Sequence, residues 1–141
     1  MANDAPNPVL ICERRLKRMM DGSSSDVVAR VWQPLQITDG AFAGEYACKY
    51  EIEGLPELYS GDAIGIDTMQ ALISALMGIY SGLRPFQKEL TQYADADDGE
   101  IGMPVVTYGS DFDGHRRLEA AVEREHRAIT DDLAKKAKGS T

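Results

Sequence analysis

The residues with the greatest potential for chemistry lie in an acidic segment late in the chain. This segment holds Asp95, Asp97, Asp98 and Glu100 within six residues, a density that raises the question of a calcium loop. An EF-hand loop that starts at Asp95 requires glycine at its sixth position and a bidentate glutamate at its twelfth. Those positions hold Glu100 and Val106, so the spacing argues against calcium binding.

A second acidic group follows, in which Asp111, Asp113 and His115 alternate at a spacing of two residues. Such a spacing could present three metal ligands on one side of an extended loop. We favour a simpler interpretation, in which Asp111 or Asp113 caps the following helix and interacts with its dipole. His126 is eleven residues from His115, about 16 Å along a helix, so the two cannot share one ion. We therefore predict no metal site and no cofactor.

The two cysteines, Cys12 and Cys48, lack the CxxC spacing of zinc or redox sites. Both are expected on apolar strand faces, where burial raises the pKa of a thiol and makes it inert. The sequence also lacks the glycine-rich dinucleotide and phosphate loops and the HExxH zinc motif. We predict no catalytic residue, and the lack of these motifs argues against an enzyme.

The net charge of the chain limits the kinds of partner that it can be expected to bind. The 141 residues include 15 basic and 23 acidic side chains, a net charge of −8. This excess disfavours binding to nucleic acid and to anionic membranes. Much of it is local, because residues 86–114 hold seven acidic side chains and one basic one. The N-terminus has no basic, apolar signal segment, and we expect a cytoplasmic protein that does not span a membrane.

Alternating polarity predicts strands over residues 9–18, 27–37 and 44–54, joined by turns at 20–26 and 38–44. In the first, Leu10, Cys12 and Leu16 are expected to share one face. In the second, Arg30 and Trp32 lie opposite the apolar residues. Pro34 places the end of that strand at an edge or a bulge. The third, with Tyr46, Cys48, Tyr50 and Ile52 alternating with mostly charged residues, has the clearest pattern.

These strands predict an α+β fold, in which a three- or four-stranded antiparallel meander packs against a central helix. The helix begins at Asp67, with Gln70 in the position of a capping-box partner. Its expected core stripe comprises Met69, Leu72, Ile73, Leu76, Tyr80 and Leu83. Ser74, Gly78 and Gly82 form another stripe, and its glycines imply close approach of the sheet or of a second helix.

Three domain segments follow from this pattern. Residues 1–8 are expected to form a flexible arm, residues 9–113 a single α+β domain, and residues 114–138 a C-terminal helix. The apolar stripe of that helix is thin, with Leu118, Val122, Ile129 and Leu133. The helix therefore either packs on the domain or pairs with a second copy.

Three segments, ERRL (residues 13–16), YACKYEIEGL (46–55) and GIDTMQALISAL (65–76), resemble a family of small bacterial proteins known as a domain of unknown function. The resemblance covers residues 9–83 and leaves out the acidic loop and the terminal helix. It implies one cytoplasmic α+β domain and identifies no catalytic residue.

Two functional hypotheses follow. The first is a non-enzymatic protein-interaction module that binds a basic partner, with an immunity-like inhibitor of a basic toxin as one candidate. Its expected contact residues are Asp95, Asp97, Asp98, Glu100, Asp111, Asp113, Trp32 and Arg30. The alternative is a small-ligand-binding protein or enzyme with a pocket between helix and sheet, lined by Asp67, Gln70, Tyr46 and Tyr50. A homodimer through a sheet edge or the terminal helix stays open.

Overall fold

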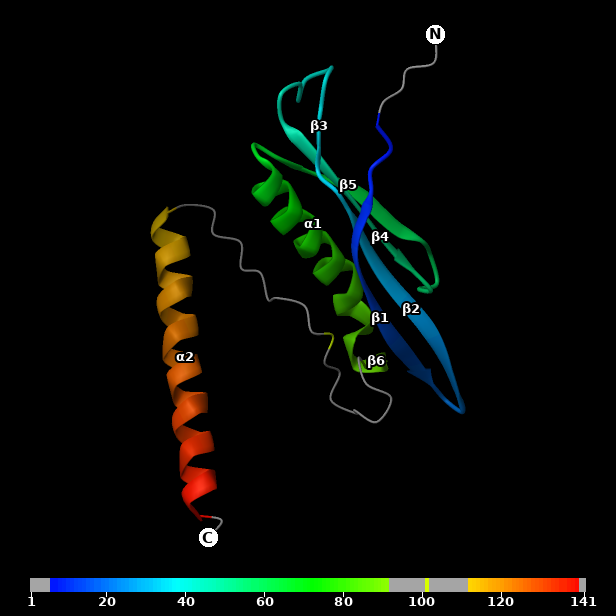
Figure 1. The fold of residues 1–141 in the computed structure, drawn as a ribbon. Helices are drawn as coiled ribbons and strands as arrows, with labels where there is room; N and C mark the ends of the chain where they lie inside the picture. Colours follow the sequence, from blue (N-terminus) through cyan, green and yellow to red (C-terminus); the bar gives the residue numbers. More distant parts are fainter. Residues whose placement is uncertain (1–5, 92–100, 102–111, 140–141) are drawn as a thin grey trace. The chain divides into compact units, whose positions relative to one another are not determined.

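The computed structural model describes residues 6–91, 101 and 112–139 (Figure 1). The chain forms two compact units, residues 1–105 and 106–141, and each is described by itself. The first unit consists of an antiparallel sheet and one long helix. The second contains one helix in its described part.

The sheet confirms the predicted antiparallel α+β fold, with six strands in place of three or four. The strands are β1 (Leu10–Met20), β2 (Ser23–Trp32), β3 (Leu35–Gln36), β4 (Tyr46–Glu53), β5 (Tyr59–Gly65) and β6 (Leu90–Thr91). The four long strands form a meander in the order β1, β2, β4 and β5. The short β6 pairs with β1, and β3 pairs with β4. Pro34, which cannot donate to a ladder, separates β2 from β3.

The first hairpin is tighter than predicted. The expected turn over residues 20–26 is only Asp21 and Gly22, since Met20 already pairs with Ser23 and the ladder continues through the serines. Gly22 has a φ of +76°, a left-handed conformation that glycine adopts without strain. The serines therefore belong to β2.

A β-bulge near the start of β1 changes which side chains face the core. The register shifts between Leu10 and Cys12, so Leu10 pairs with Trp32 on the outer face of the sheet. The prediction that Leu10 shares a face with Cys12 and Leu16 was wrong. Leu16 is buried, but Cys12 is exposed. The prediction of a buried Cys12 was therefore also wrong.

The helix α1 (Thr68–Leu83) lies along one face of the sheet, over β4 and β5, and reaches β2 (Figure 1). Of the predicted stripe, only Leu83 is fully buried. The buried positions of α1 are Ala71, Ala75, Ile79, Gly82 and Leu83, three of which are small. Of the predicted stripe, Met69 and Ile73 are exposed, and Leu72, Leu76 and Tyr80 are only partly buried.

The glycines explain this orientation of α1. A Cβ atom at Gly78 would lie 2.7 Å from the hydroxyl oxygen of Tyr50, and one at Gly82 would lie 2.7 Å from Cδ1 of Ile52. Because the large side chains are on the sheet, the helix must present small ones. The close approach expected from the glycines is thus confirmed for the sheet.

The core lies between α1 and the inner face of the sheet. The sheet contributes Leu16, Val27, Ala29, Val31, Cys48 and Ile52, and α1 contributes Ala71, Ala75, Ile79 and Leu83. After α1, the 3-10 helix η1 (Arg84–Glu89) carries Pro85 in its first turn and leads into β6. Leu90 and Ile101 complete the core on the β1 side, where Nη1 of Arg14 donates to the carbonyl of Ile101 at 3.2 Å.

The second unit contains α2 (Phe112–Gly139). Along it, Val122, Ile129 and Leu133 are exposed. Docking of this helix and its pairing with a second copy both stay predictions. Among the described residues, neither α1 nor α2 combines the length and the hydrophobicity of a bilayer-spanning helix.

Candidate functional site

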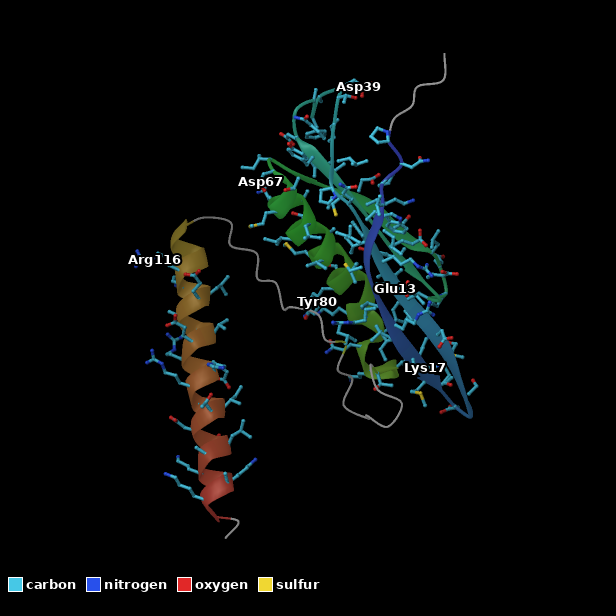
Figure 2. All side chains as sticks on the ribbon, in the orientation of Figure 1. Glu13, Lys17, Asp39, Asp67, Tyr80 and Arg116 are labelled. Carbon is cyan, nitrogen blue, oxygen red and sulfur yellow. The ribbon has the colours of Figure 1, made fainter. Side chains whose placement is uncertain are left out.

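Arg30 lies on the face of the sheet opposite α1, at the centre of an ion-pair network that joins three strands. Its guanidinium lies 2.6 Å from Glu53 and 3.4 Å from Glu51, both on β4, and 3.5 Å from Glu13 on β1. The hydrogen bond to Glu53 raises the pKa of Arg30 above its ordinary value. The network continues along β1, where Arg15 pairs with Glu13 and Lys17 pairs with Asp26. Figure 2 labels Glu13 and Lys17 on this strand.

Trp32 lies on the same face, at the end of β2, and is partly buried. Nζ of Lys49 stands 4.7 Å from the centre of its ring, within the range of a cation–π contact. Arg30 and Trp32 thus both have intramolecular partners. A role for them in partner binding stays a prediction.

The acidic contact residues predicted from the sequence have no described side chains. Asp95, Asp97, Asp98, Glu100 and Asp111 lie outside the described residues. Asp113 falls in the first turn of α2, but its side chain lies outside the described part. Their role in partner binding therefore stays a prediction.

Asp67, which is labelled in Figure 2, and Gln70 cap the start of α1. The backbone N–H of Gln70 donates to Oδ1 of Asp67 at 2.7 Å. In return, the N–H of Ile66 donates to Oε1 of Gln70, also at 2.7 Å. Two backbone donors at the helix start are satisfied by two side chains, as in a capping box. Both side chains are thus engaged in hydrogen bonds at the helix start. Their role as pocket lining stays a prediction.

Substitution of Asp67 separates capping from other roles. We expect Asp67→Ala to lower the free energy of unfolding by about 1 kcal/mol, because the N–H of Gln70 loses its acceptor. Asp67→Asn keeps an acceptor and should remain close to wild type. Urea denaturation of both variants measures the difference. An equal loss in Asp67→Asn would mean that the carboxylate charge, and not the cap, stabilises the fold.

Tyr46 and Tyr50 pack against the core cluster from β4. The Tyr50 ring fills the space left by Gly61 and Gly78, and its centroid lies 6.2 Å from that of Tyr59. A described cavity of about 280 Å³ lies elsewhere, at the C-terminal end of α1. Its lining comprises Leu55, Pro56, Glu57, Leu58, Tyr59, Gly82 and Phe86. None of the four residues predicted to line a pocket takes part in it.

The outward side of α1 is a surface that sequence reasoning missed. Ile66, just before the helix, is 72% exposed, Met69 is 71% exposed and Ile73 is 48% exposed. The stretch from Thr68 to Leu83 contains no charged side chain. In the sequence, this absence of charge is the signal for the exposed apolar surface, because a helix with one solvent-exposed side ordinarily carries charged residues on that side. We call Ile66, Met69 and Ile73 the apolar side of α1.

The two cysteines have different environments. Cys48 is fully buried, and burial raises the pKa of its thiol to about 11. Its sulfur donates to the carbonyl of Trp32 at 3.2 Å. The Cys48 thiol therefore stays protonated at neutral pH and suits neither nucleophilic attack nor metal binding. Over the described ranges, no three side chains of the His, Cys, Asp or Glu type gather as a metal site would require.

The sequence matches the model of a known protein family. The sequence model of a family described as a domain of unknown function, DUF6968, covers residues 12–105. The chain belongs to this family. The DUF6968 match spans the whole sheet from Cys12, together with α1, and it ends where the first compact unit ends. It includes the acidic residues 95–100, so the expectation that the resemblance stops at residue 83 was wrong. The helix α2 lies outside the match.

Comparison of the DUF6968 chain with curated proteins and with solved structures gives no match.

Proposed function

We propose that this DUF6968 domain is a protein-interaction module of the bacterial cytoplasm, which binds a basic partner protein through the apolar side of α1. The observation that carries the proposal is the exposure of Ile66, Met69 and Ile73 beside a helix without charges. Exposed apolar side chains that cluster on one surface are typical of protein–protein contacts.

The way in which α1 packs supports this proposal. A helix that is apolar nearly all round is normally buried on all sides. Here α1 places Ala71, Ala75 and Gly82, together with Ile79 and Leu83, against the sheet, while Met69 and Ile73 stay exposed. Leu72, Leu76 and Tyr80 are only partly buried beside the core cluster. A partner that covers this side would bury them together with Met69 and Ile73.

Charge supports a basic partner. The chain carries a net charge of −8, and between Lys49 and Arg84 it has five acidic side chains and no basic one. These acidic residues are Glu51, Glu53, Glu57, Asp62 and Asp67. Glu51 and Glu53 lie on the face of the sheet away from α1, whereas Asp67 is next to Ile66 at the start of the helix. Opposite net charge on two partners increases association rates at long range and disfavours wrong partners. An immunity-like inhibitor of a basic toxin remains one candidate within this class.

A matched pair of charge insertions tests the proposal. We expect Ile73→Glu to weaken the complex at least about tenfold, because a carboxylate would be desolvated at the contact. Ser81→Glu adds the same charge to the exposed Ser81 of α1, outside the apolar side, and should change affinity less than about twofold. Urea denaturation verifies that both variants fold.

The partner is obtained by photo-crosslinking from position 73 in the source cell, and its affinity for each purified variant is then measured. The proposal is supported if the captured protein is basic and if only Ile73→Glu weakens the complex. Equal affinities for wild type and Ile73→Glu would contradict it. So would a crosslink only to a second copy of this chain, which would identify a homodimer.

A further inference from the structure

The strand β5 forms one border of the sheet. All seven of its residues pair with β4 in a regular register, from Tyr46 opposite Gly65 to Ile52 opposite Tyr59. Over residues 6–91, no other strand pairs with β5, so its second edge has no backbone partner there. Such an edge presents N–H and C=O groups to any extended chain that approaches it.

The opposite border of the sheet is protected in ways that β5 is not. There β1 carries a β-bulge, pairs with β6 through Lys17 and Arg18, and has four basic side chains. Bulges, lysines and covering segments are the usual devices that prevent edge pairing. The sequence of β5, Tyr-Ser-Gly-Asp-Ala-Ile-Gly, has no lysine and no proline, and its pairing shows no bulge. Its single charged side chain is Asp62.

We propose that the free edge of β5 binds an extended, basic segment of a partner protein as an additional strand. In this mode, backbone hydrogen bonds supply affinity, and pockets for alternate side chains supply specificity. The cavity of about 280 Å³ lies at the Tyr59 end of β5 and accepts one apolar side chain of the segment. This site is separate from the apolar side of α1 and goes beyond the function proposed above.

The composition of the cavity fits this occupant. Apart from Glu57, its lining is apolar, with Leu58 and Tyr59 exposed at its surface. Gly82 contributes no side chain, and the Tyr59 ring packs so closely against it that a Cβ there would lie 2.7 Å from Cδ1 of the ring. Glu57 adds a carboxylate to the rim, where a basic residue next to the buried apolar one would find a counter-charge.

Charge also selects the occupant. Asp62 is the only charge on β5, with Lys49 of β4 opposite it in the register, and Glu57 lies close to β5 in the chain, at the cavity. A second copy that paired through β5 would bring another Asp62 and another Glu57 to the same edge. Like charges across paired strands are destabilising, whereas lysine or arginine beside aspartate is favourable. The geometry therefore favours a basic segment over a β5-to-β5 dimer.

Three synthetic heptapeptides test this proposal on the full chain: alternating lysine and valine, alternating glutamate and valine, and the lysine–valine peptide with alternate amides N-methylated. We expect the first peptide to protect the β5 amides from hydrogen exchange. The glutamate peptide should bind at least about fivefold more weakly, because each of its charges repels Asp62. The methylated peptide should not bind, since it cannot complete the ladder.

Charge-reversal variants show whether the peptide binds at β5. Asp62→Lys should weaken the lysine–valine peptide about fivefold, and Asp39→Lys, the same reversal in the exposed β3–β4 loop, should leave its affinity unchanged. Ile73→Glu should also leave the affinity for this peptide unchanged, so failure of the α1 proposal would not imply failure of the β5 proposal.

Three results would overturn the β5 proposal: equal binding of all peptides, protection outside β5, or peptide-independent protection that grows with protein concentration. The last result would identify a second copy as the occupant.

Discussion

Replacement of Gly54 by alanine is expected to lower the free energy of unfolding by at least about 3 kcal/mol. Gly54 follows β4 directly and has a φ of +98°, which side-chain-bearing residues rarely adopt. An added Cβ would also collide with the carbonyl oxygen of Asp26 and lie 3.1 Å from Cα of Val27. Both obstacles belong to the backbone of β2, which cannot move without breaking its ladder.

The control for this variant is Gly22→Ala. Gly22 has a similarly positive φ of +76°, but a Cβ there would meet no atom within 4 Å. Its replacement therefore measures conformational strain alone, about 1 to 2 kcal/mol. Urea denaturation of both variants gives the comparison. Equal losses would show that β4 and β2 separate easily at Gly54, against the close contact described.

Replacement of Gly82 by alanine should lower the free energy of unfolding by about 2 kcal/mol. This loss is a net value, since alanine favours a helix interior by about 1 kcal/mol relative to glycine. The added Cβ would lie 2.7 Å from Cδ1 of Ile52 and 2.7 Å from ring atoms of Tyr59. The fit between α1 and the sheet leaves no space for a methyl group.

A second substitution makes this expectation specific. Ile52→Val removes Cδ1, one of the two obstacles beside the Tyr59 ring, and by itself should cost about 1 kcal/mol. If the two residues are in contact, the double variant loses less than the sum of the single variants, by about 0.5 to 1 kcal/mol. Strict additivity would show that the Gly82 methyl group is accommodated elsewhere, and α1 would not be held at the described distance.

The strand pattern was predictable where large apolar and charged residues alternate. In β4, Cys48, Tyr50 and Ile52 face the core, as their spacing indicates. In β5 the inward positions hold Tyr59, Gly61, Ala63 and Gly65, most of which are small because α1 passes close above them. Small residues give no polarity signal, so periodicity could not identify this strand.

The start of α1 was also predictable, but its rotation was not. Capping depends on local hydrogen bonds, which Asp67 and Gln70 make within four residues. The rotation of α1 about its own axis depends on the side chains of the sheet that face it. Ranking by hydrophobicity places leucine and methionine toward the sheet, whereas Tyr50 and Ile52 already occupy that space. The exposure of Met69 and Ile73 follows from the side chains of another element, which a helical pattern does not contain.

The candidate contact residues show the same limit. Arg30 and Trp32 lie on the face that alternation assigns to them, but Glu53 and Lys49 occupy their side chains. Cross-strand neighbours depend on register, and register depends on turns and bulges that periodicity does not fix. The bulge between Leu10 and Cys12 is such a case, since it moved Leu10 to the outer face.

The uneven placement of charge across the sheet has a consequence for motion in solution. Basic side chains gather on β1, at Arg14, Arg15, Lys17 and Arg18, while the chain from Tyr50 to Leu83 is purely acidic in its charges. Over residues 6–91, charge is therefore separated into an electric dipole across the width of the sheet. In the field of a positively charged molecule, the torque on this dipole turns the β5 border forward before collision, an effect that added salt removes.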